Sequence, residues 1–491
     1  MFEAAEVGHE VAKKEFEKEV LALRTKLLKA QQALRESKFP VIVIVSGVET
    51  AGKSEVVNRL SEWLDTRGVQ TAAFWDESDE ERERPPHWRF WRSLPANGTI
   101  GILFGSWYTQ PIVQRAFRDI GRKAYEAALN RIARLESMLA DDRAVIVKLW
   151  FHISKKEQAH RLRKIRKEQK RKLTPYEKSY SKMYNRFAKV SEVAIRATDQ
   201  GYAPWHIIDS QDHHYRDLMA GRVLLAAMEA GLARGAERRT PRGAAVEEAG
   251  KHVNVLTSLD LKARLAPKAY EEQFEKYQAR LNRLAWKLYN RKRSTVILFE
   301  GSDAAGKGGA IRRVVKALDA RLFRVIPVAA PTDEERAHHY LWRFWRQLPR
   351  AGYFTIYDRS WYGRVLVERV EGFARPDEWG RAYEEITDFE EQLAEHGITV
   401  CKFWLQISAA EQLRRFKERE RVAYKKHKIT AEDWRNRRKW DAYESAIDEM
   451  VARTSTETSP WTLVAANDKR HARVEVLKTL CQRIEATLER D

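Results

Sequence analysis

Residues 301–308 of this 491-residue chain spell GSDAAGKG, and this stretch decides how the chain folds. It comes directly after an apolar stretch, residues 295–300, and before a segment of helical character that starts at Gly309. Glycines at this spacing let the backbone curl so that successive N–H groups point inward, while the helix and Lys307 add positive charge. The stretch therefore predicts a phosphate-binding loop between a strand and a helix.

A second glycine loop lies 254 positions upstream (301 − 47), where residues 47–54 spell GVETAGKS. The same offset aligns SWY at residues 106–108 with SWY at residues 360–362. One offset that holds over more than a hundred residues indicates a duplicated domain rather than chance. We expect a first domain at residues 1–235, a linker at 236–255 that is rich in Gly, Ala, Pro and charge, and a second domain at 256–491.

Each copy is predicted to be an α/β domain. It opens with an amphipathic helix, and a buried apolar strand, a glycine loop and another helix follow. Units of this kind favour a parallel sheet with helices on both faces. The expected architecture is a three-layer, P-loop kinase-like fold with a helical lid, present twice.

The two copies differ in the acids that phosphoryl transfer requires. The first loop matches the G-x-x-x-x-G-K-[ST] pattern fully, and the second does not, because it ends in glycine. Transfer nevertheless needs a divalent cation, and the cation needs carboxylates. The second copy has Asp358 at the end of an apolar strand and Asp303 in its loop, whereas the first has Phe104 and Glu49 there. We expect only the second copy to be catalytic.

The overall charge favours a polyanionic partner. The chain has 90 Lys+Arg against 70 Asp+Glu, a formal charge of +20, which suits nucleic acid, anionic lipid or a phosphate-rich substrate. Residues 414–439 are strongly basic and occupy the position of a nucleotide-kinase lid. A solvated helix face or nucleic-acid binding would also explain them. Two cysteines, an acidic N-terminus and no long apolar run predict a cytoplasmic protein that crosses no membrane.

With these motifs in place, the second half resembles the polyphosphate kinase 2 family, and the first half does so in degenerate form. The matching segments are the loop GSDAAGKGG at 301–309, LWRF at 341–344, DRSWY at 358–362 and KWxxY at 439–443.

The duplicated layout is similar to the two-domain class of that family, which implies transfer of a phosphate from inorganic polyphosphate to AMP to give ADP. The resemblance implies that Asp303 and Asp358 organise Mg²⁺, with Mn²⁺ as an alternative, and that Lys307 holds the phosphates. It makes Arg359, Arg414 and Arg421 candidates for stabilising transition-state charge. The implied phosphate- and nucleotide-binding residues are Gly301, Ser302, Ala304, Ala305, Gly306, Gly308, Gly309, Thr332, Glu335 and Arg343.

Three other functions stay open at this point. The acceptor could be ADP or GDP, or the enzyme could be a nucleotide kinase that uses ATP. A polyanion- or RNA-binding protein with a vestigial fold is disfavoured, because binding alone would not need Asp303 and Asp358. We expect neither a nucleic-acid nor a membrane partner, and we leave open a homo-oligomer and a pseudo-dimer of the two domains.

Overall fold

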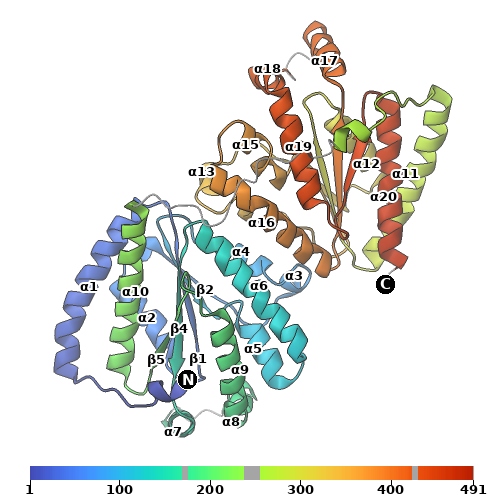
Figure 1. Ribbon diagram of the computed structural model, residues 1–491. Helices are drawn as coiled ribbons and strands as arrows, with labels where there is room; N and C mark the ends of the chain where they lie inside the picture. Colours follow the sequence, from blue (N-terminus) through green and yellow to red (C-terminus); the bar gives the residue numbers. More distant parts are fainter. Residues whose placement is uncertain (169–174, 237–254, 423–428, 490–491) are drawn as a thin grey trace. The chain divides into compact units, whose positions relative to one another are not determined.

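The computed structural model describes residues 1–168, 175–236, 255–422 and 429–489, which form two compact units, each built on its own five-stranded sheet (Figure 1). Nearly all of the predicted linker and the middle of the predicted lid, residues 423–428, fall outside the described residues. Within the described residues no helix has both the length and the apolar composition that a membrane crossing requires.

The two sheets share one topology. All strand pairs are parallel, and the order β2-β3-β1-β4-β5 in the first sheet corresponds to β7-β8-β6-β9-β10 in the second. Strands β4 and β9 are buried along their whole length, as parallel strands covered on both faces should be. The strands are β1 (Val41–Gly47), β2 (Val69–Ala73), β3 (Ile100–Phe104), β4 (Val145–His152), β5 (Trp205–Asp209), β6 (Thr295–Gly301), β7 (Phe323–Pro327), β8 (Phe354–Asp358), β9 (Thr399–Gln406) and β10 (Trp461–Ala465).

Helices cover both faces of the first sheet. Side chains of α1 (Lys13–Arg35), α2 (Lys53–Trp63) and α10 (His213–Ala236) share one apolar core with alternate strand residues. The opposite face carries α5 (Thr109–Phe117), α6 (Arg122–Asp141) and α9 (Tyr184–Thr198) (Figure 1). The shorter elements are η1 (Phe2–Ala5), η2 (Thr66–Gly68), α4 (Trp88–Trp91), α7 (Lys155–Glu168) and α8 (Pro175–Lys182).

The second sheet is covered in the same way, so the predicted duplicated three-layer fold is confirmed. The helices α11 (Pro267–Asn290), α12 (Lys307–Ala317) and α20 (Lys469–Glu489) pack on one face. The other face carries α16 (Pro376–Glu395) and α19 (Trp440–Thr454). The remaining elements are η3 (Val255–Ser258), α14 (Trp342–Trp345), η4 (Trp361–Arg364), α15 (Val367–Val370) and the two described lid helices α17 (Ala409–Arg421) and α18 (Ala431–Arg438).

Each unit also includes a short segment from the opposite half of the sequence. Residues 332–342, which contain α13 (Asp333–Arg336), belong to the first unit, and residues 78–88, which contain α3 (Asp79–Arg82), belong to the second. Within the second unit His87 Nδ1 lies 2.9 Å from Gln392 Oε1, and Arg350 donates to Glu83 at 2.6 Å. The boundaries of the units therefore differ from a simple division of the chain at the linker.

A buried ion pair lies in the core of each unit. In the second unit Lys402 Nζ donates to Glu390 at 2.7 Å and to the Tyr362 hydroxyl at 2.8 Å, and Lys402 and Glu390 are almost wholly buried. Lys148 and Glu136 form the same 2.7 Å pair in the first unit. Since both copies retain this network, the tyrosine of the repeated SWY motif is explained by the fold and not by the chemistry.

Candidate active site

The second glycine loop has the backbone geometry of a phosphate-binding loop. Gly301 adopts φ +150°, and a Cβ there would meet the carbonyl oxygen of Leu405 at 2.5 Å, so only glycine fits. Gly306, at φ +115°, lets the chain turn directly into α12. Lys307, the first residue of that helix, donates to the carbonyl oxygen of Gly301 at 2.6 Å. Backbone N–H groups, the helix N-terminus and an ammonium group therefore converge at one place.

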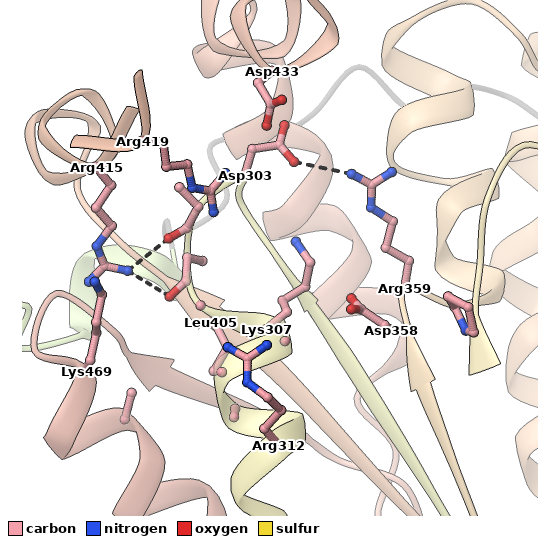
Figure 2. A pocket seen from close by; sticks show the side chains of 18 of the residues that line it. Asp303, Lys307, Arg312, Asp358, Arg359, Leu405, Arg415, Arg419, Asp433 and Lys469 are labelled. Atoms are coloured by element: carbon pink, nitrogen blue, oxygen red, sulfur yellow. Dashed lines mark hydrogen bonds and ion pairs between the residues drawn. The ribbon is translucent and has the colours of Figure 1, made fainter. Parts of the chain in front are cut away.

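A cavity of about 850 Å³ opens above this loop and collects most of the predicted catalytic residues (Figure 2). Asp303, Lys307, Asp358 and Arg359 all line it. The Arg359 guanidinium donates to Asp303 Oδ1 at 3.3 Å. Predicted phosphate-binding residues in the same wall are Ala304, Ala305, Gly306, Gly308 and Gly309.

Cations that the sequence did not single out line much of the rest of this cavity. A long phosphate chain is a strong polyanion, and arginine is well suited to phosphate oxygens. In the sequence these residues are scattered through the chain, so only the fold shows that they share one wall. They are Arg312, Arg415, Arg419, Lys469 and Arg473.

Arg415 is buried, and its contacts hold the loop in shape. Its guanidinium donates to the carbonyl oxygens of Ala304 and Ala305, both at 2.9 Å, and to that of Ala466 at 2.7 Å. In the first unit Arg161, 254 positions earlier, makes similar bonds to Thr50 and Ser210. The repetition of this arginine at the offset of 254 is visible in the sequence, but the catalytic candidate proposed from the sequence is its neighbour Arg414.

The other predicted arginines and the polar loop lie elsewhere. Arg414 pairs with Glu411 and Glu418 and, like Arg421, is not among the residues that line the cavity. Arg343 donates to the carbonyl oxygen of Ala329. It lines neither this cavity nor the smaller cavity beside it. Thr332 and Glu335 cap α13, which belongs to the first unit. The roles of these five residues stay predictions.

A second, smaller cavity of about 90 Å³ shares Asp303 and Arg359 with the first. Gly301 and Ser302 also line it, and its remaining wall is largely apolar and aromatic. A flat, partly apolar ligand with one anionic end would find matching chemistry here. The apolar and aromatic side chains of that wall are Leu366, Val367, Trp404, Trp440, Tyr443 and Ile447.

Glu300 is a buried carboxyl group beneath the site that sequence reasoning missed. Burial raises its pKa, which Lys307 and a hydrogen bond from Ser360 oppose. The Ser360 hydroxyl donates to Glu300 Oε1 at 2.8 Å and so ties the start of the glycine loop to the segment that follows Asp358. Ser46 occupies the corresponding position in the first copy.

The first copy has the same loop geometry with different surroundings. Lys53 lies 3.5 Å from Glu49, and the Arg216 guanidinium is packed so closely on Gly52 that a Cβ there would meet it at 1.6 Å. Arg216 is itself paired with Asp217 at 2.8 Å. In the first copy, acidic side chains therefore engage both cations beside the glycine loop.

The donor set of the second copy suits Mg²⁺. No group of three or more His, Cys, Asp or Glu side chains that could hold a metal occurs within the described ranges. Mg²⁺ typically takes one or two protein carboxylates and fills its remaining positions with phosphate oxygens and water. Asp303 and Asp358, beside the loop, provide such a pair.

Comparison with known proteins gives one consistent result. The profile described as polyphosphate kinase 2 (PPK2) matches residues 10–235 and again 264–491. The chain is 50% identical to a polyphosphate:AMP phosphotransferase of Pseudomonas aeruginosa and 47% identical to one of Pseudomonas syringae, over all of this chain and 99–100% of each relative. A crystal structure from Pseudomonas aeruginosa, described as a polyphosphate kinase 2, superposes over the full length of both chains with a TM-score of 0.90 and 49% identity.

Proposed function

Because the chain belongs to the polyphosphate kinase 2 family, we propose that it transfers the terminal phosphate of inorganic polyphosphate to AMP and so forms ADP. Membership in the family does not by itself determine which nucleotide accepts the phosphate. The duplicated layout and the names of the two Pseudomonas relatives support AMP over ADP or GDP.

One observation carries the proposal: the cation-lined cavity and the aromatic cavity meet at Asp303 and Arg359. The larger cavity suits a phosphate chain, and the aromatic wall of the smaller one suits the base of a nucleotide. A donor and an acceptor bound in this way would bring their phosphates together beside the glycine loop. Holding two reactants in line in this manner supplies a large part of the rate acceleration in phosphoryl transfer.

The reaction needs little proton chemistry from the protein. An oxygen of the AMP phosphate attacks the terminal phosphorus of polyphosphate, and the bond between that phosphorus and the bridging oxygen breaks. ADP forms, and the donor leaves one phosphate shorter. Because the attacking oxygen is already ionised, no strong general base is required.

The residues of the site then act through charge and position. Lys307 and the loop N–H groups would hold the transferred phosphate, and Arg359 would stabilise the charge that develops on it. Asp303 and Asp358 would hold Mg²⁺, or Mn²⁺, which neutralises charge on the phosphate oxygens when bound. Arg312, Lys469 and Arg473 would bind the rest of the phosphate chain.

The first unit is proposed to be non-catalytic, because Phe104 and Gly105 stand where the second unit has Asp358 and Arg359. We further propose a cytoplasmic location, to which two buried free cysteines are suited.

The decisive experiment is an acceptor and donor panel with the full-length protein. Incubation with AMP, polyphosphate and Mg²⁺ should give ADP, detected by ion-exchange chromatography. Phosphorylation of ADP or GDP but not of AMP would show that the acceptor is a nucleoside diphosphate and not AMP. Activity with ATP in the absence of polyphosphate would instead identify an ordinary nucleotide kinase.

A further inference from the structure

The carboxylate of Asp303 is held from two sides. Arg359 donates to its Oδ1 atom at 3.3 Å, and Asn436 Nδ2 donates to its Oδ2 atom at 2.8 Å. Arg359 follows strand β8, whereas Asn436 lies on α18 in the lid. Helix α18 of the lid thus directly contacts the Asp303 carboxylate, which is proposed to hold the metal.

The lid helix is in turn anchored by a cluster around Glu371, which we call the Glu371 cluster: Glu371, Arg435, Lys439 and Tyr443. The Glu371 side chain is only 4% exposed; it forms an ion pair with Arg435 at 2.9 Å and accepts a hydrogen bond from Lys439 at 3.0 Å. The Tyr443 hydroxyl lies 3.4 Å from Glu371 and 3.3 Å from Asn436 Oδ1. Burial raises the pKa of Tyr443, so its hydroxyl keeps the proton that it donates.

A second connection reaches the backbone of Asp303. Gln412, on α17, donates to the carbonyl oxygen of Asp303 at 3.1 Å, and Arg437, on α18, donates to Gln412 Oε1 at 3.0 Å. The neighbouring residues Asn436 and Arg437 therefore reach Asp303 by a direct route and by a route through Gln412. The side chain of Asp303 thus contacts α18 directly, and its carbonyl group is connected to α18 through Gln412.

The first unit shows which of these connections the fold itself requires. Gln158 keeps the backbone connection and donates to the carbonyl oxygen of Glu49 at 3.3 Å. The side-chain connection is absent from the equivalent positions. From α8 and α18 onward the two copies align at an offset of 256, so Tyr180 and Phe187 correspond to Asn436 and Tyr443. Phe117 corresponds to Glu371 at the earlier offset of 254. The Tyr180 ring packs on both phenylalanine rings, with centroids 5.3 Å from Phe187 and 5.9 Å from Phe117. The polar connection thus occurs in the unit that has Asp303 and Asp358, and an aromatic cluster replaces it in the unit that has Glu49 and Phe104 at those positions.

We propose that Asn436 is a positioning residue through which the lid sets the orientation of the Asp303 carboxylate. The inference rests on the proposed function, because it takes Asp303 to organise the metal and the attacking phosphate. Each carboxylate oxygen has two acceptor sites, so one oxygen can accept from Asn436 and still face a metal ion. Partners of this kind orient metal-binding carboxylates, and their removal typically costs about 10–100-fold in metal affinity or activity.

The test compares Asn436→Ala with Arg438→Ala, a change at an exposed position of the same helix. We expect Asn436→Ala to lower kcat with AMP by about 10–100-fold and to weaken Mn²⁺ binding, measured calorimetrically without nucleotide, by a similar factor. The KM for polyphosphate should stay within about twofold, because the phosphate-chain wall is untouched. Arg438→Ala should leave all three quantities unchanged, and Glu371→Gln should shift kcat and Mn²⁺ affinity in the same direction as Asn436→Ala, by less.

The outcomes separate the two proposals. An Asn436→Ala enzyme with unchanged kcat and Mn²⁺ affinity would overturn the positioning role and leave the proposed reaction intact. A uniform loss of every parameter together with a lower melting temperature would also overturn it, since the residue would then be merely structural. If the wild-type protein makes no ADP, the proposed reaction fails, while weaker Mn²⁺ binding by Asn436→Ala still supports the lid contact.

Discussion

The two units of this protein share a scaffold and differ in the few positions where phosphoryl transfer needs charge. Both have the same parallel strand order, a glycine loop that leads into a helix, an arginine that donates to carbonyl oxygens of this loop, and a buried lysine–glutamate pair. At the ends of strands β3 and β8, however, the first unit has Phe104 and Gly105 at the positions where the second unit has Asp358 and Arg359. A motif present in both copies, such as the glycine loop, therefore does not identify the catalytic unit, whereas Asp358 and Arg359, present in only one, distinguish the two.

The largest effect is expected from Arg359→Gly, which gives the second unit the residue of the first. Arg359 has φ +66°, a left-handed conformation that strains any residue with a side chain, and Gly105 adopts φ +78° without that cost. We expect kcat to fall by about 10³-fold or more, because the charge that stabilises the transition state is lost. The free energy of unfolding should be unchanged or higher, which denaturant titration measures. Lower stability together with normal activity would contradict the assignment.

The next effect concerns the shared core. Lys402→Met leaves Glu390 buried without its partner and should lower the free energy of unfolding by about 3–5 kcal/mol. Lys148→Met is its matched counterpart in the first unit and should cost about as much, measured by calorimetry. Unequal losses in the two variants would show that the scaffolds are less alike than their geometry suggests.

A smaller effect separates the two glycine loops. Lys307→Ala should lower kcat by about 10²–10³-fold, the usual cost of removing one electrostatic contact to a transition state. Lys53→Ala should leave kcat within about twofold, because the first unit has Phe104 and Gly105 in place of Asp358 and Arg359, and Lys53 is paired with Glu49. Steady-state kinetics with AMP and polyphosphate provide the measurement. Equal losses would make the first unit catalytic after all.

The smallest effect is expected in residues 78–88, the segment of the N-terminal half that belongs to the second unit. Its exposed ion pair with Arg350 lowers the pKa of Glu83, chiefly through the hydrogen bond. A lowered pKa contributes stability at neutral pH that is lost as the pH falls through the folded-state value. Glu83→Gln should therefore cost up to about 1 kcal/mol at pH 7 and nothing in strong acid, measured as a difference in melting temperature. A deficit that persists in acid would point to a cause other than the ion pair.

The sequence predicted the duplication, the sheet class and the central residues of the site, because those features are local or repeat at a fixed offset. Asp303, Lys307, Asp358 and Arg359 belong to short motifs next to strands, and the fold brings them to one cavity. It could not predict residues whose role depends on which distant segments meet. Lys469 and Arg473 come from the last helix, more than 160 residues beyond the glycine loop (469 − 307).

Basic residues in the lid show a second limit. Composition identified the segment as cationic but could not tell which side of a helix faces the cavity. Arg415 and Arg419 line the cavity, whereas Arg414 and Arg421 do not. Asn436 was overlooked for a different reason, since an uncharged amide in a highly charged stretch gives no signal until its contact with Asp303 is seen.

The exchanged segments also bear on how the chain is made. Residues 332–342 complete the first unit, so that unit cannot finish folding until synthesis has passed well into the second half of the protein. Domains ordinarily fold one after another as they leave the ribosome. Here the N-terminal unit has to wait with part of its surface uncovered while its missing piece is translated. Separating the two halves genetically would therefore remove a short segment from each unit.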